Sequence, residues 1–436
     1  MIELKNPKED LNELIKHILI KSDLSIYVKD YIKKLKIDRM ANKKFILISF
    51  GKGASSMVNG AIEMLNDKIE GGVVVIPKGT KRPKGNLEVI ESSHPIPDEN
   101  SIKAADSIIE WTKIRGNVGF LFLISGGGSS LVEKPLRPIT LDDLKELNKI
   151  LLNSGASISE INTVRKHVSQ IKGGRLATFV YPKKAYGLYA SDVPGDILDQ
   201  IASGPTVPDT TTFNDAFNVI INYNLKESIP KSVLKVLIDG VNRKIRDTPK
   251  PNDKIFKKIK NEIIAKNESI LKHISKLLKG KGYKTIILTS RIEGESKDVG
   301  YALASITLDS INKGLPLRPP IALILGGETS VTVKGKGIGG RNMELALAWG
   351  LKVNEQISYK RAAILAFATD GIDGPTDSAG TLLSSEDINY IKSLGIDIKK
   401  ELKDNNSYYV LNKASLLIKT GPTGSNLNNI IVVAIK

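Results

Sequence analysis

The segment Phe120–Ser130 constrains the fold more than any other part of the chain. It reads Phe-Leu-Phe-Leu-Ile-Ser-Gly-Gly-Gly-Ser-Ser, so a run of large apolar residues ends abruptly in glycines flanked by serines. Such an apolar run is typical of a strand buried on both faces of a parallel sheet. Glycine lets the backbone turn with positive φ and lets anions approach its N–H groups. Loops of this kind, at the carboxyl ends of strands, are where open α/β sheets bind phosphates and other anions.

Strand-like and helix-like segments alternate along most of the chain. This succession predicts an α/β protein with a mostly parallel sheet that is covered on both faces. The helix at 140–152 has Thr140 as a suitable N-cap and acidic residues in its first turn. The predicted strands are 45–50, 72–76, 121–124, 185–191, 285–289, 321–325, 363–368 and 430–435, and the predicted helices are 54–66, 100–113, 140–152, 296–313, 342–351 and 385–394.

A length of 436 residues predicts two or three domains, because one hydrophobic core serves about 150 residues. The regular alternation is interrupted from about Asn224 to Glu268, where Lys, Asn and Pro are frequent. We therefore place the boundary there and expect an N-terminal domain over 1–240 and a C-terminal domain over 241–436.

The composition excludes several classes of protein. There is no cysteine, which rules out disulfides, thiolate catalysis and cysteine metal sites. The longest apolar runs are far shorter than the ~18 residues of a membrane span, and the charged N-terminal segment lacks the apolar core of a signal peptide. We therefore expect a soluble cytoplasmic protein. The net charge of +17 favours a lysine-rich solvated surface over nucleic-acid binding, because aromatic residues, at 5%, are too few for a stacking platform.

Two glycine-rich segments carry a cation. Phe50–Ser56 follows a predicted strand and opens a helix, so Lys52 would lie beside helix N–H groups, a combination that suits a carboxylate or phosphate. Arg341 stands at the expected start of a helix after a glycine-rich stretch, where its guanidinium would bind an anion in bidentate fashion. The alternative for Lys52 is a surface lysine on a tight turn. Residues 335, 337 and 340 match the G-x-G-x-x-G pattern, but without a clear strand–turn–helix unit the match is weak.

Two loops after strands are rich in aspartate. Asp192 and Asp196 fall in one of them, and Asp370, Asp373 and Asp377 fall in the other. Carboxylates in such loops suit a hydrated Mg²⁺ or a general base, whereas Asp, Pro and Gly are also ordinary turn residues. Both interpretations remain open at this point. The four histidines are scattered without metal-ligand spacing, so structural or surface roles are favoured for His94 and His167.

Glycine loops at strand ends, two cations and aspartates in loops after strands together favour phosphoryl transfer. That reaction needs cationic clamps, oriented N–H groups and carboxylates for Mg²⁺, with little covalent chemistry by the protein. The residues alone therefore predict a kinase or another enzyme of phosphorylated or carboxylated small molecules. No G-x-S-x-G nucleophile elbow is present to support a hydrolase.

At these residues the chain resembles the two-domain, MOFRL-containing glycerate 2-kinases. The matching segments run in family order from about residue 45 to 430, and the region from about 225 to 310 carries little signal. They are Gly51–Ala54, Ser93–Asp98, Leu123–Ser130, Glu160–His167, Lys172–Ala177, Ser191–Asp196, Ile201–Asp209, Gly326–Thr329, Gly339–Glu344, Thr369–Asp377 and Thr420–Gly424.

The resemblance implies two α/β domains, the N-terminal one a Rossmann-like three-layer sandwich, with the active site in the cleft between them. It implies ATP- and Mg²⁺-dependent phosphorylation of D-glycerate at the 2-hydroxyl, with Lys52 and Arg341 as the catalytic cations. For substrate binding it points to those two residues and to Ser125, Gly126, Gly127, Gly128, Ser129 and Ser130. For the cofactor it points to Asp192, Gly326, Gly327, Glu328, Thr329, Gly339 and Gly340, and for the metal to Asp192 and Asp370.

The resemblance also implies small-molecule partners only, with no nucleic acid and no membrane, and a homo-oligomer, with a dimer favoured. One departure from the family is that we would expect an aspartate near Asn429. Two alternatives remain: an NAD(P)-dependent hydroxypyruvate reductase, which would need a nicotinamide site at residues 335–340, and a basic nucleic-acid-binding protein, which rests on net charge alone.

Overall fold

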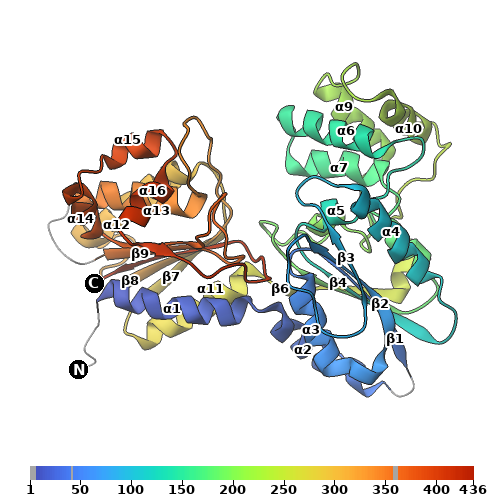
Figure 1. Cartoon of the computed structure of the whole chain (residues 1–436), viewed down its shortest axis with the longest axis horizontal. Helices are drawn as coiled ribbons and strands as arrows, with labels where there is room; N and C mark the ends of the chain where they lie inside the picture. Colours follow the sequence, from blue (N-terminus) through green and yellow to red (C-terminus); the bar gives the residue numbers. More distant parts are fainter. Residues whose placement is uncertain (1–5, 41–42, 357–361) are drawn as a thin grey trace. The chain divides into compact units, whose positions relative to one another are not determined.

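The computed structural model describes residues 6–40, 43–356 and 362–436. These residues form two compact units. The first unit spans residues 24–265, and the second combines residues 266–436 with the N-terminal residues through Asp23. Figure 1 shows that each unit has a central sheet with helices on both sides. The prediction of two α/β domains is confirmed.

The sheet of the first unit is entirely parallel, as the long apolar runs predicted. Its strand order is β3-β2-β1-β4-β5-β6, so the chain moves outward in one direction from β1 and then in the other from β4. This is the order of a Rossmann-type sheet. The six strands are β1 Lys44–Phe50, β2 Ile69–Pro77, β3 Glu88–Ser92, β4 Val118–Ile124, β5 Ala185–Ala190 and β6 Ile259–Ala265.

The register brings the ends of the central strands level. Phe50 at the end of β1 pairs with Ile124 at the end of β4, and Ile124 pairs with Tyr189 near the end of β5. The loops that leave these three strands therefore emerge at one edge of the sheet. The predicted loops at Lys52, Ser125–Ser130 and Asp192 all belong to this edge.

Helices cover the first sheet and also form a further layer. In Figure 1, α2 and α3 lie below the sheet, and α6, α7, α9 and α10 gather above it. The upper group has its own apolar core, which includes Leu147, Val164 and Leu237. The helices are α2 Leu24–Lys34, α3 Ala54–Leu65, α4 Glu99–Thr112, α5 Gly128–Leu131, α6 Leu141–Asn153, α7 Ile158–Val168, α8 Arg175–Val180, α9 Phe213–Asn222 and α10 Lys231–Val241.

The sheet of the second unit is mixed. Its order is β11-β10-β9-β12-β8-β7, and β12 runs antiparallel between β9 and β8. Consequently the start of β12 lies beside the ends of β8 and β9, with Asn429 opposite Gly327 and Ala368. The strands are β7 Lys284–Ile292, β8 Ile321–Gly327, β9 Ala362–Ala368, β10 Gly380–Ser384, β11 Leu417–Ile418 and β12 Asn429–Ile435.

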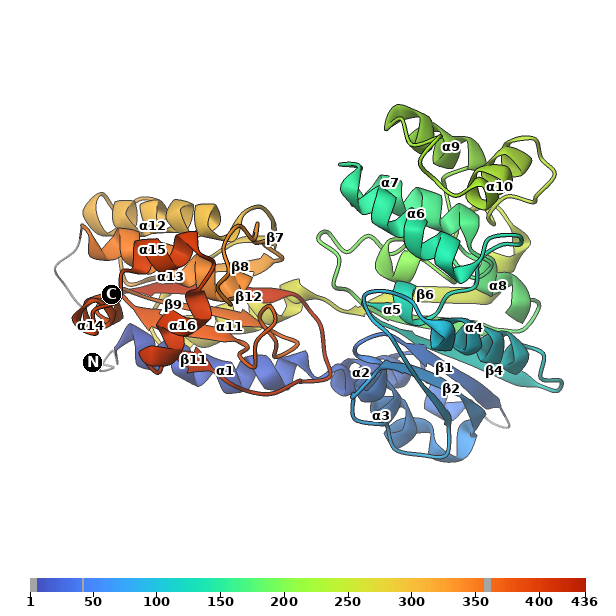
Figure 2. The same cartoon turned by 45° about the horizontal axis from the view of Figure 1, so that its top comes forward.

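Two helical layers sandwich this mixed sheet. Figure 2 shows α12 and α13 on one face and α1 and α11 on the other. Helix α13 is almost wholly buried, and Trp349 is among its fully buried side chains. The helices are α1 Pro7–Ser22, α11 Asn267–Gly280, α12 Ser296–Asn312, α13 Arg341–Asn354, α14 Asp387–Ser393, α15 Ile398–Lys403 and α16 Ser407–Lys413.

The structure divides the chain at places other than the predicted boundary between residues 240 and 241. Residues 241–265 stay with the first unit, because β6 adds a parallel strand beside β5. The N-terminal helix α1 packs with the second unit, against α11 and β9. The Tyr283 hydroxyl donates to the buried Asp10 carboxylate (2.8 Å), and Lys8 pairs with Asp387 (2.7 Å), which fixes the helix there.

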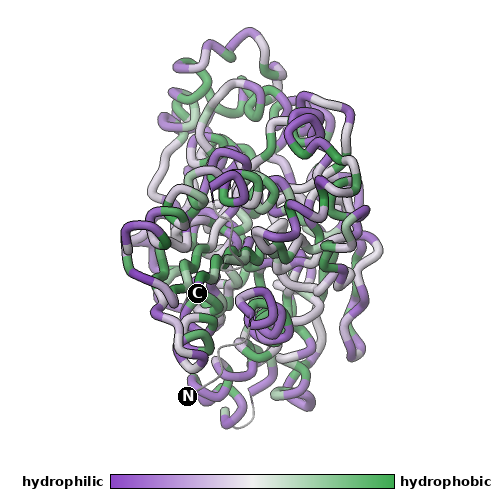
Figure 3. Tube along the Cα trace, turned by 90° about the vertical axis from the view of Figure 1, so that its left-hand side faces the viewer, coloured by the Kyte–Doolittle hydropathy of each residue, from purple (hydrophilic) through white to green (hydrophobic). Residues whose placement is uncertain are grey.

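The hydrophobic segments are concentrated inside. In Figure 3 the green trace lies mostly in the interior, and purple segments dominate the outer loops and helix turns. In the described part of the chain, no helix combines the length and the apolar character needed to cross a bilayer.

Candidate active site

Lys52 and the Ser125–Ser130 loop meet at the point where the first sheet reverses its winding direction. The Lys52 N–H donates to the Gly126 carbonyl (2.8 Å), and the Gly53 N–H donates to the Ser125 hydroxyl (2.9 Å). Because β1 and β4 are neighbours from which the chain leaves in opposite directions, a crevice opens outside their carboxyl ends, and ligands of open α/β sheets bind there. The structure thus brings together two segments that are more than seventy residues apart.

Gly127 shows why this loop needs glycine. Its φ is +80°, and a Cβ atom there would lie 2.9 Å from Cδ2 of His94 and 3.2 Å from Cγ of Lys52. Lys52, His94 and the glycine loop are therefore immediate neighbours. Partial burial of the ring and the nearby Lys52 ammonium lower the pKa of His94 to about 4, which keeps its imidazole neutral near pH 7.

Asp192 lies against the same loop. A Cβ atom on Gly126 would come within 1.6 Å of its Oδ2, so only glycine allows the carboxylate to approach so closely. The Ser129 hydroxyl contacts the Ser203 hydroxyl (2.8 Å), which donates to Asn162 (3.3 Å). The structure therefore gathers Lys52, the Ser125–Ser130 loop and Asp192 at one edge. It adds Ser203 and Asn162, which lie in the matching segments Ile201–Asp209 and Glu160–His167 but had been assigned no site role.

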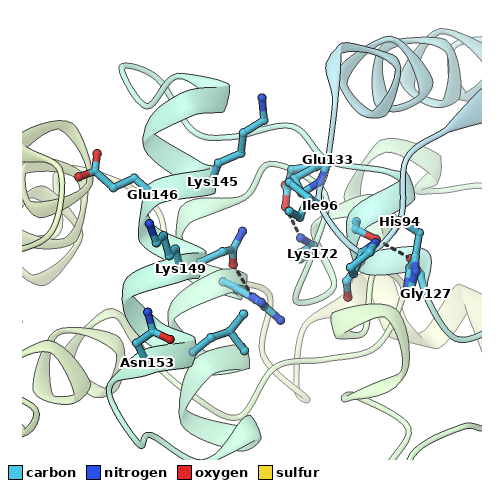
Figure 4. A pocket seen from close by; sticks show the side chains of 16 residues that line it. His94, Ile96, Gly127, Glu133, Lys145, Glu146, Lys149, Asn153 and Lys172 are labelled. Carbon is cyan, nitrogen blue, oxygen red and sulfur yellow. Dashed lines mark hydrogen bonds and ion pairs between the residues drawn. The ribbon is translucent and has the colours of Figure 1, made fainter. Parts of the chain in front are cut away.

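A cavity of about 860 Å³ in the first unit adjoins this edge. Figure 4 shows His94 and Gly127 on one side and four residues of α6, Lys145, Glu146, Lys149 and Asn153, on the other, with Glu133 and Lys172 between them. Cationic side chains outnumber carboxylates in its lining. The lining residues are His94, Pro95, Ile96, Pro97, Gly127, Ser129, Ser130, Glu133, Lys145, Glu146, Asn148, Lys149, Leu152, Asn153, Arg165 and Lys172.

Local sequence explains how α6 and α7 reach this cavity. Each helix begins with a capping box, in which Thr140 and Asp143 of α6, and Ser157 and Glu160 of α7, exchange side-chain and backbone hydrogen bonds. The Nε of Arg165 in α7 then donates to Oδ1 of Asn148 in α6 (2.7 Å), which ties the two helices together beside the cavity.

A buried ion pair forms part of the cavity wall. The Lys172 ammonium pairs with the Glu133 carboxylate, and both side chains are almost completely buried. Glu133 also accepts hydrogen bonds from the Ser169 hydroxyl (2.7 Å) and the Lys134 N–H (2.9 Å). Burial lowers the pKa of Lys172, while the Glu133 charge opposes that shift. Sequence reasoning did not pair these two residues, because Glu133 and Lys172 belong to separate loops.

In the second unit, Arg341 is the first residue of α13 and pairs with Glu328, which follows β8. Gly326 and Gly327 end β8, and Thr329 is buried and accepts a hydrogen bond from the Ser296 hydroxyl (2.9 Å). Arg341 and Glu328 therefore lie together at the carboxyl end of a strand. Lys52 belongs to the first unit and Arg341 to the second.

Buried asparagines surround the end of β8. Asn267 donates through Nδ2 to the backbone carbonyls of Leu427 (2.7 Å) and Asn429 (3.1 Å). In the part of the chain that the structure describes, Oδ1 of Asn267, Oδ1 of Asn428 and the whole side-chain amide of Asn429 have no hydrogen-bond partner. Buried polar atoms without partners are rare and costly, so these amides suit a polar ligand.

The aspartates of the second unit separate into different roles. Asp373 is buried and accepts the N–H groups of Asn342 (3.1 Å) and Met343 (3.0 Å), so it caps α13, and its burial raises its pKa. Asp377 pairs with Lys419 (2.9 Å) at the surface. Asp370 remains in the loop that follows β9, where its Oδ1 accepts the Ile372 N–H (3.2 Å). For Asp373 the structure therefore favours a structural role over a role in binding Mg²⁺ or as a general base.

The glycines of the G-x-G-x-x-G pattern have a packing role. Cβ atoms on Gly335 and Gly337 would come within 2.3 and 2.4 Å of residues 404 and 406, and the Gly335 N–H already donates to Asn405 (3.0 Å). Gly339 and Gly340 are similarly pressed against Ser407 and Asp373. These glycines allow two backbone segments to approach closely, so the geometry gives no support to a dinucleotide fingerprint.

His167 is a structural residue. Its ring is fully buried, with Nδ1 at 2.8 Å from the Thr163 carbonyl oxygen and Nε2 at 3.0 Å from Asp247. The ring also packs edge-on against Phe213. Among the described residues no group of three or more His, Asp or Glu side chains is placed to hold a metal ion by itself.

Comparison with known proteins covers almost the whole chain. Residues 10–238 match a domain of unknown function named DUF4147, and residues 321–429 match the MOFRL family. A D-glycerate 2-kinase of Thermotoga maritima is 40% identical, over 97% of this chain and 98% of that protein. A glycerate 2-kinase of Pyrococcus horikoshii is 42% identical, over 90% of this chain and 87% of that protein.

A solved structure and a differently named relative complete the comparison. The crystal structure of the glycerate kinase of Thermotoga maritima superposes with a TM-score of 0.85 at 39% identity, covering 98% of this chain and all of that one. A protein of Agrobacterium vitis, named as a candidate hydroxypyruvate reductase, is 38% identical over 89% of this chain and 99% of that protein. The matched domains and the full-length similarity show that this chain belongs to the family of MOFRL-containing glycerate 2-kinases.

Proposed function

We propose that this chain transfers the terminal phosphoryl group of ATP to the 2-hydroxyl of D-glycerate and releases 2-phosphoglycerate and ADP. The observation that carries the proposal is the cluster of Lys52, the Ser125–Ser130 loop and Asp192 at the switch point of a Rossmann-type sheet. The names of the relatives from Thermotoga maritima and Pyrococcus horikoshii support the same substrate.

In this proposal the cations neutralise the migrating phosphoryl group. Lys52 is held through its backbone against the glycine loop, and Arg341 is held by Glu328. Because preorganised charges are worth more than mobile ones, removal of one such donor costs roughly 10²–10³ in rate.

ATP and Mg²⁺ fit the residues that are present. Among the described residues, the unpartnered Oδ1 atoms of Asn267 and Asn428 and the unpartnered side-chain amide of Asn429 offer buried polar atoms to a nucleotide. Mg²⁺ prefers one or two carboxylates together with phosphate oxygens and water, so Asp192 and Asp370 are the candidates to hold it or to receive the hydroxyl proton. Bound Mg²⁺ would supply further neutralisation of the phosphate charge.

The test is ADP release with D-glycerate, ATP and Mg²⁺. We expect glycerate-dependent ADP from the wild-type protein and a loss of roughly 10²–10³ in Lys52→Ala. The exposed Lys226, replaced by alanine, is the matched control and should retain full activity. Absence of glycerate-dependent ADP from the wild type, or NAD(P)H oxidation with hydroxypyruvate, would contradict the proposal.

A further inference from the structure

Arg165 is the one cavity-lining arginine, and the mechanism above leaves it unused. It lies in the last turn of α7 and lines the same cavity as Gly127 and Ser130. Its Nε donates to Oδ1 of Asn148 (2.7 Å). This single bond fixes the plane of the guanidinium, because the group is rigid and its donors lie in a fixed fork.

The bond to Asn148 leaves the outer edge of the guanidinium open. Within the described residues, neither Nη1 nor Nη2 of Arg165 has a hydrogen-bond partner, and the side chain is half-buried. The free edge carries two parallel N–H donors, which is the arrangement that binds a carboxylate through two hydrogen bonds. The arginine of the second unit differs, because Arg341 already pairs with Glu328.

The nearest buried carboxylate does not neutralise Arg165. Glu133 directs its two oxygens to Lys172, Ser169 and the Lys134 N–H. Burial accordingly lowers the pKa of Arg165, with Glu133 opposing the shift only through space. A half-buried cation without a hydrogen-bonded counter-ion loses part of its hydration, so an anionic ligand on this side chain would be stabilising.

We propose that the outer edge of Arg165 binds the carboxylate of the acceptor substrate and selects an acid over an uncharged polyol. The inference deepens the proposed function and rests on it. The apolar Ile96, Pro97 and Leu152 also line the cavity and suit the short carbon chain of glycerate. The substrate hydroxyls are then left for the Ser125–Ser130 loop and Lys52.

The test compares D-glycerate with D-glyceramide, its uncharged amide, as phosphoryl acceptors. In Arg165→Met we expect the KM for D-glycerate to rise roughly 10- to 150-fold, because hydrogen bonds to a charged group are lost. The KM for ATP and the weak use of D-glyceramide should stay unchanged. In Arg165→Lys the KM for D-glycerate should lie between the values of the wild type and of Arg165→Met, because lysine keeps the positive charge but lacks the planar pair of N–H donors.

A second variant keeps the inference testable if Arg165→Met fails to fold. Asn148→Asp preserves size but places a carboxylate against Nε, so it should neutralise the guanidinium and raise the KM for D-glycerate alone. Equal losses with both acceptors would show a merely structural role and overturn the inference. A rise in the KM for ATP instead would assign Arg165 to a nucleotide phosphate and would overturn it as well.

Calorimetry without nucleotide separates this inference from the proposed function. We expect D-glycerate to bind the wild-type protein and to bind Arg165→Met more weakly by the same factor. Unchanged binding in the variant would overturn the inference even if the kinase activity is confirmed. Binding that depends on Arg165 in a protein without kinase activity would uphold the carboxylate site and overturn only the phosphoryl transfer.

Discussion

The two sheets of this chain assemble their polar edges differently. In the first unit every strand is parallel, so the loops after β1, β4 and β5 emerge at one edge with Lys52, the glycine loop and Asp192. In the second unit β12 is antiparallel, so its first residue, Asn429, joins the ends of β8 and β9. At one edge of a parallel sheet lie the residues that follow its strands. At the same edge of a mixed sheet lie also the residues that precede an antiparallel strand.

The charges of the two edges differ as well. The first unit buries its ion pair, Lys172–Glu133, with side chains 4% and 2% exposed. The second leaves Arg341–Glu328 partly exposed, at 25% and 40%. A buried pair is costly to break, whereas an exposed pair contributes little to stability. The free energy of unfolding should therefore be far more sensitive to substitution in the Lys172–Glu133 pair than in the Arg341–Glu328 pair.

The largest expected effect is on the buried pair. Glu133→Gln should lower the free energy of unfolding by about 3–5 kcal/mol, because it leaves the Lys172 ammonium buried without a counter-ion. Denaturant unfolding measures this change in the free energy of unfolding. The double variant Glu133→Gln with Lys172→Met should recover part of the loss, and a change below about 1 kcal/mol in the single variant would show that the pair is not buried as described.

Next in size is a pair of glycines with nearly equal φ. Gly127 has φ of +80° and Gly79 has φ of +77°, so alanine should cost about 1–2 kcal/mol at either position. A Cβ on Gly127 meets His94 and Lys52, whereas a Cβ on Gly79 meets nothing within 4 Å. Gly127→Ala should therefore also lose activity, and Gly79→Ala should not. Similar activity in the two variants would argue against Lys52 at the site.

The titration of His94 probes the same neighbours. Its pKa of about 4 predicts a neutral ring through the physiological range, and NMR of the histidine side chains measures the midpoint. Since the folded pKa lies below the unfolded value of about 6.5, this group stabilises the fold above pH 6.5, and its contribution is lost as the pH falls toward 4. In Lys52→Met the midpoint should rise, because one positive neighbour is removed. An unchanged midpoint near 6.5 in both proteins would place Lys52 elsewhere.

The smallest expected change in stability is at the exposed pair of the second unit. Glu328→Gln should alter the free energy of unfolding by less than about 1 kcal/mol, because solvent screens the pair. The same denaturant experiment as for Glu133→Gln provides the comparison. A loss as large as that of Glu133→Gln would remove the contrast between the two units.

The fold could be predicted where apolar runs were long. The predicted strands at 45–50, 121–124 and 430–435 lie within the buried strands β1, β4 and β12. The edge strand β6 was not predicted, because most of its residues are only half-buried and its segment is rich in lysine. The N-terminal α1 could not be assigned to the second unit either, since its amphipathic pattern shows that it packs but not against what.

The site could be predicted only where residues follow strands. Lys52, Ser125 and Asp192 were each singled out because they follow a predicted strand, and the parallel sheet brings the ends of those strands to one edge. Asn148 and Arg165 lie on helices α6 and α7, not directly after strands, so the strand rule did not bring them together. The one sequence signal was that Arg165 lies in the matching segment Glu160–His167, to which no site role was assigned.

The most direct test of the central claim is phosphorus NMR of the product formed from D-glycerate, ATP and Mg²⁺. The account predicts the signal of 2-phosphoglycerate, formed by the wild-type protein and lost in Lys52→Ala. A 3-phosphoglycerate signal would contradict the choice of hydroxyl, and the absence of any phosphorylated product would contradict the kinase itself.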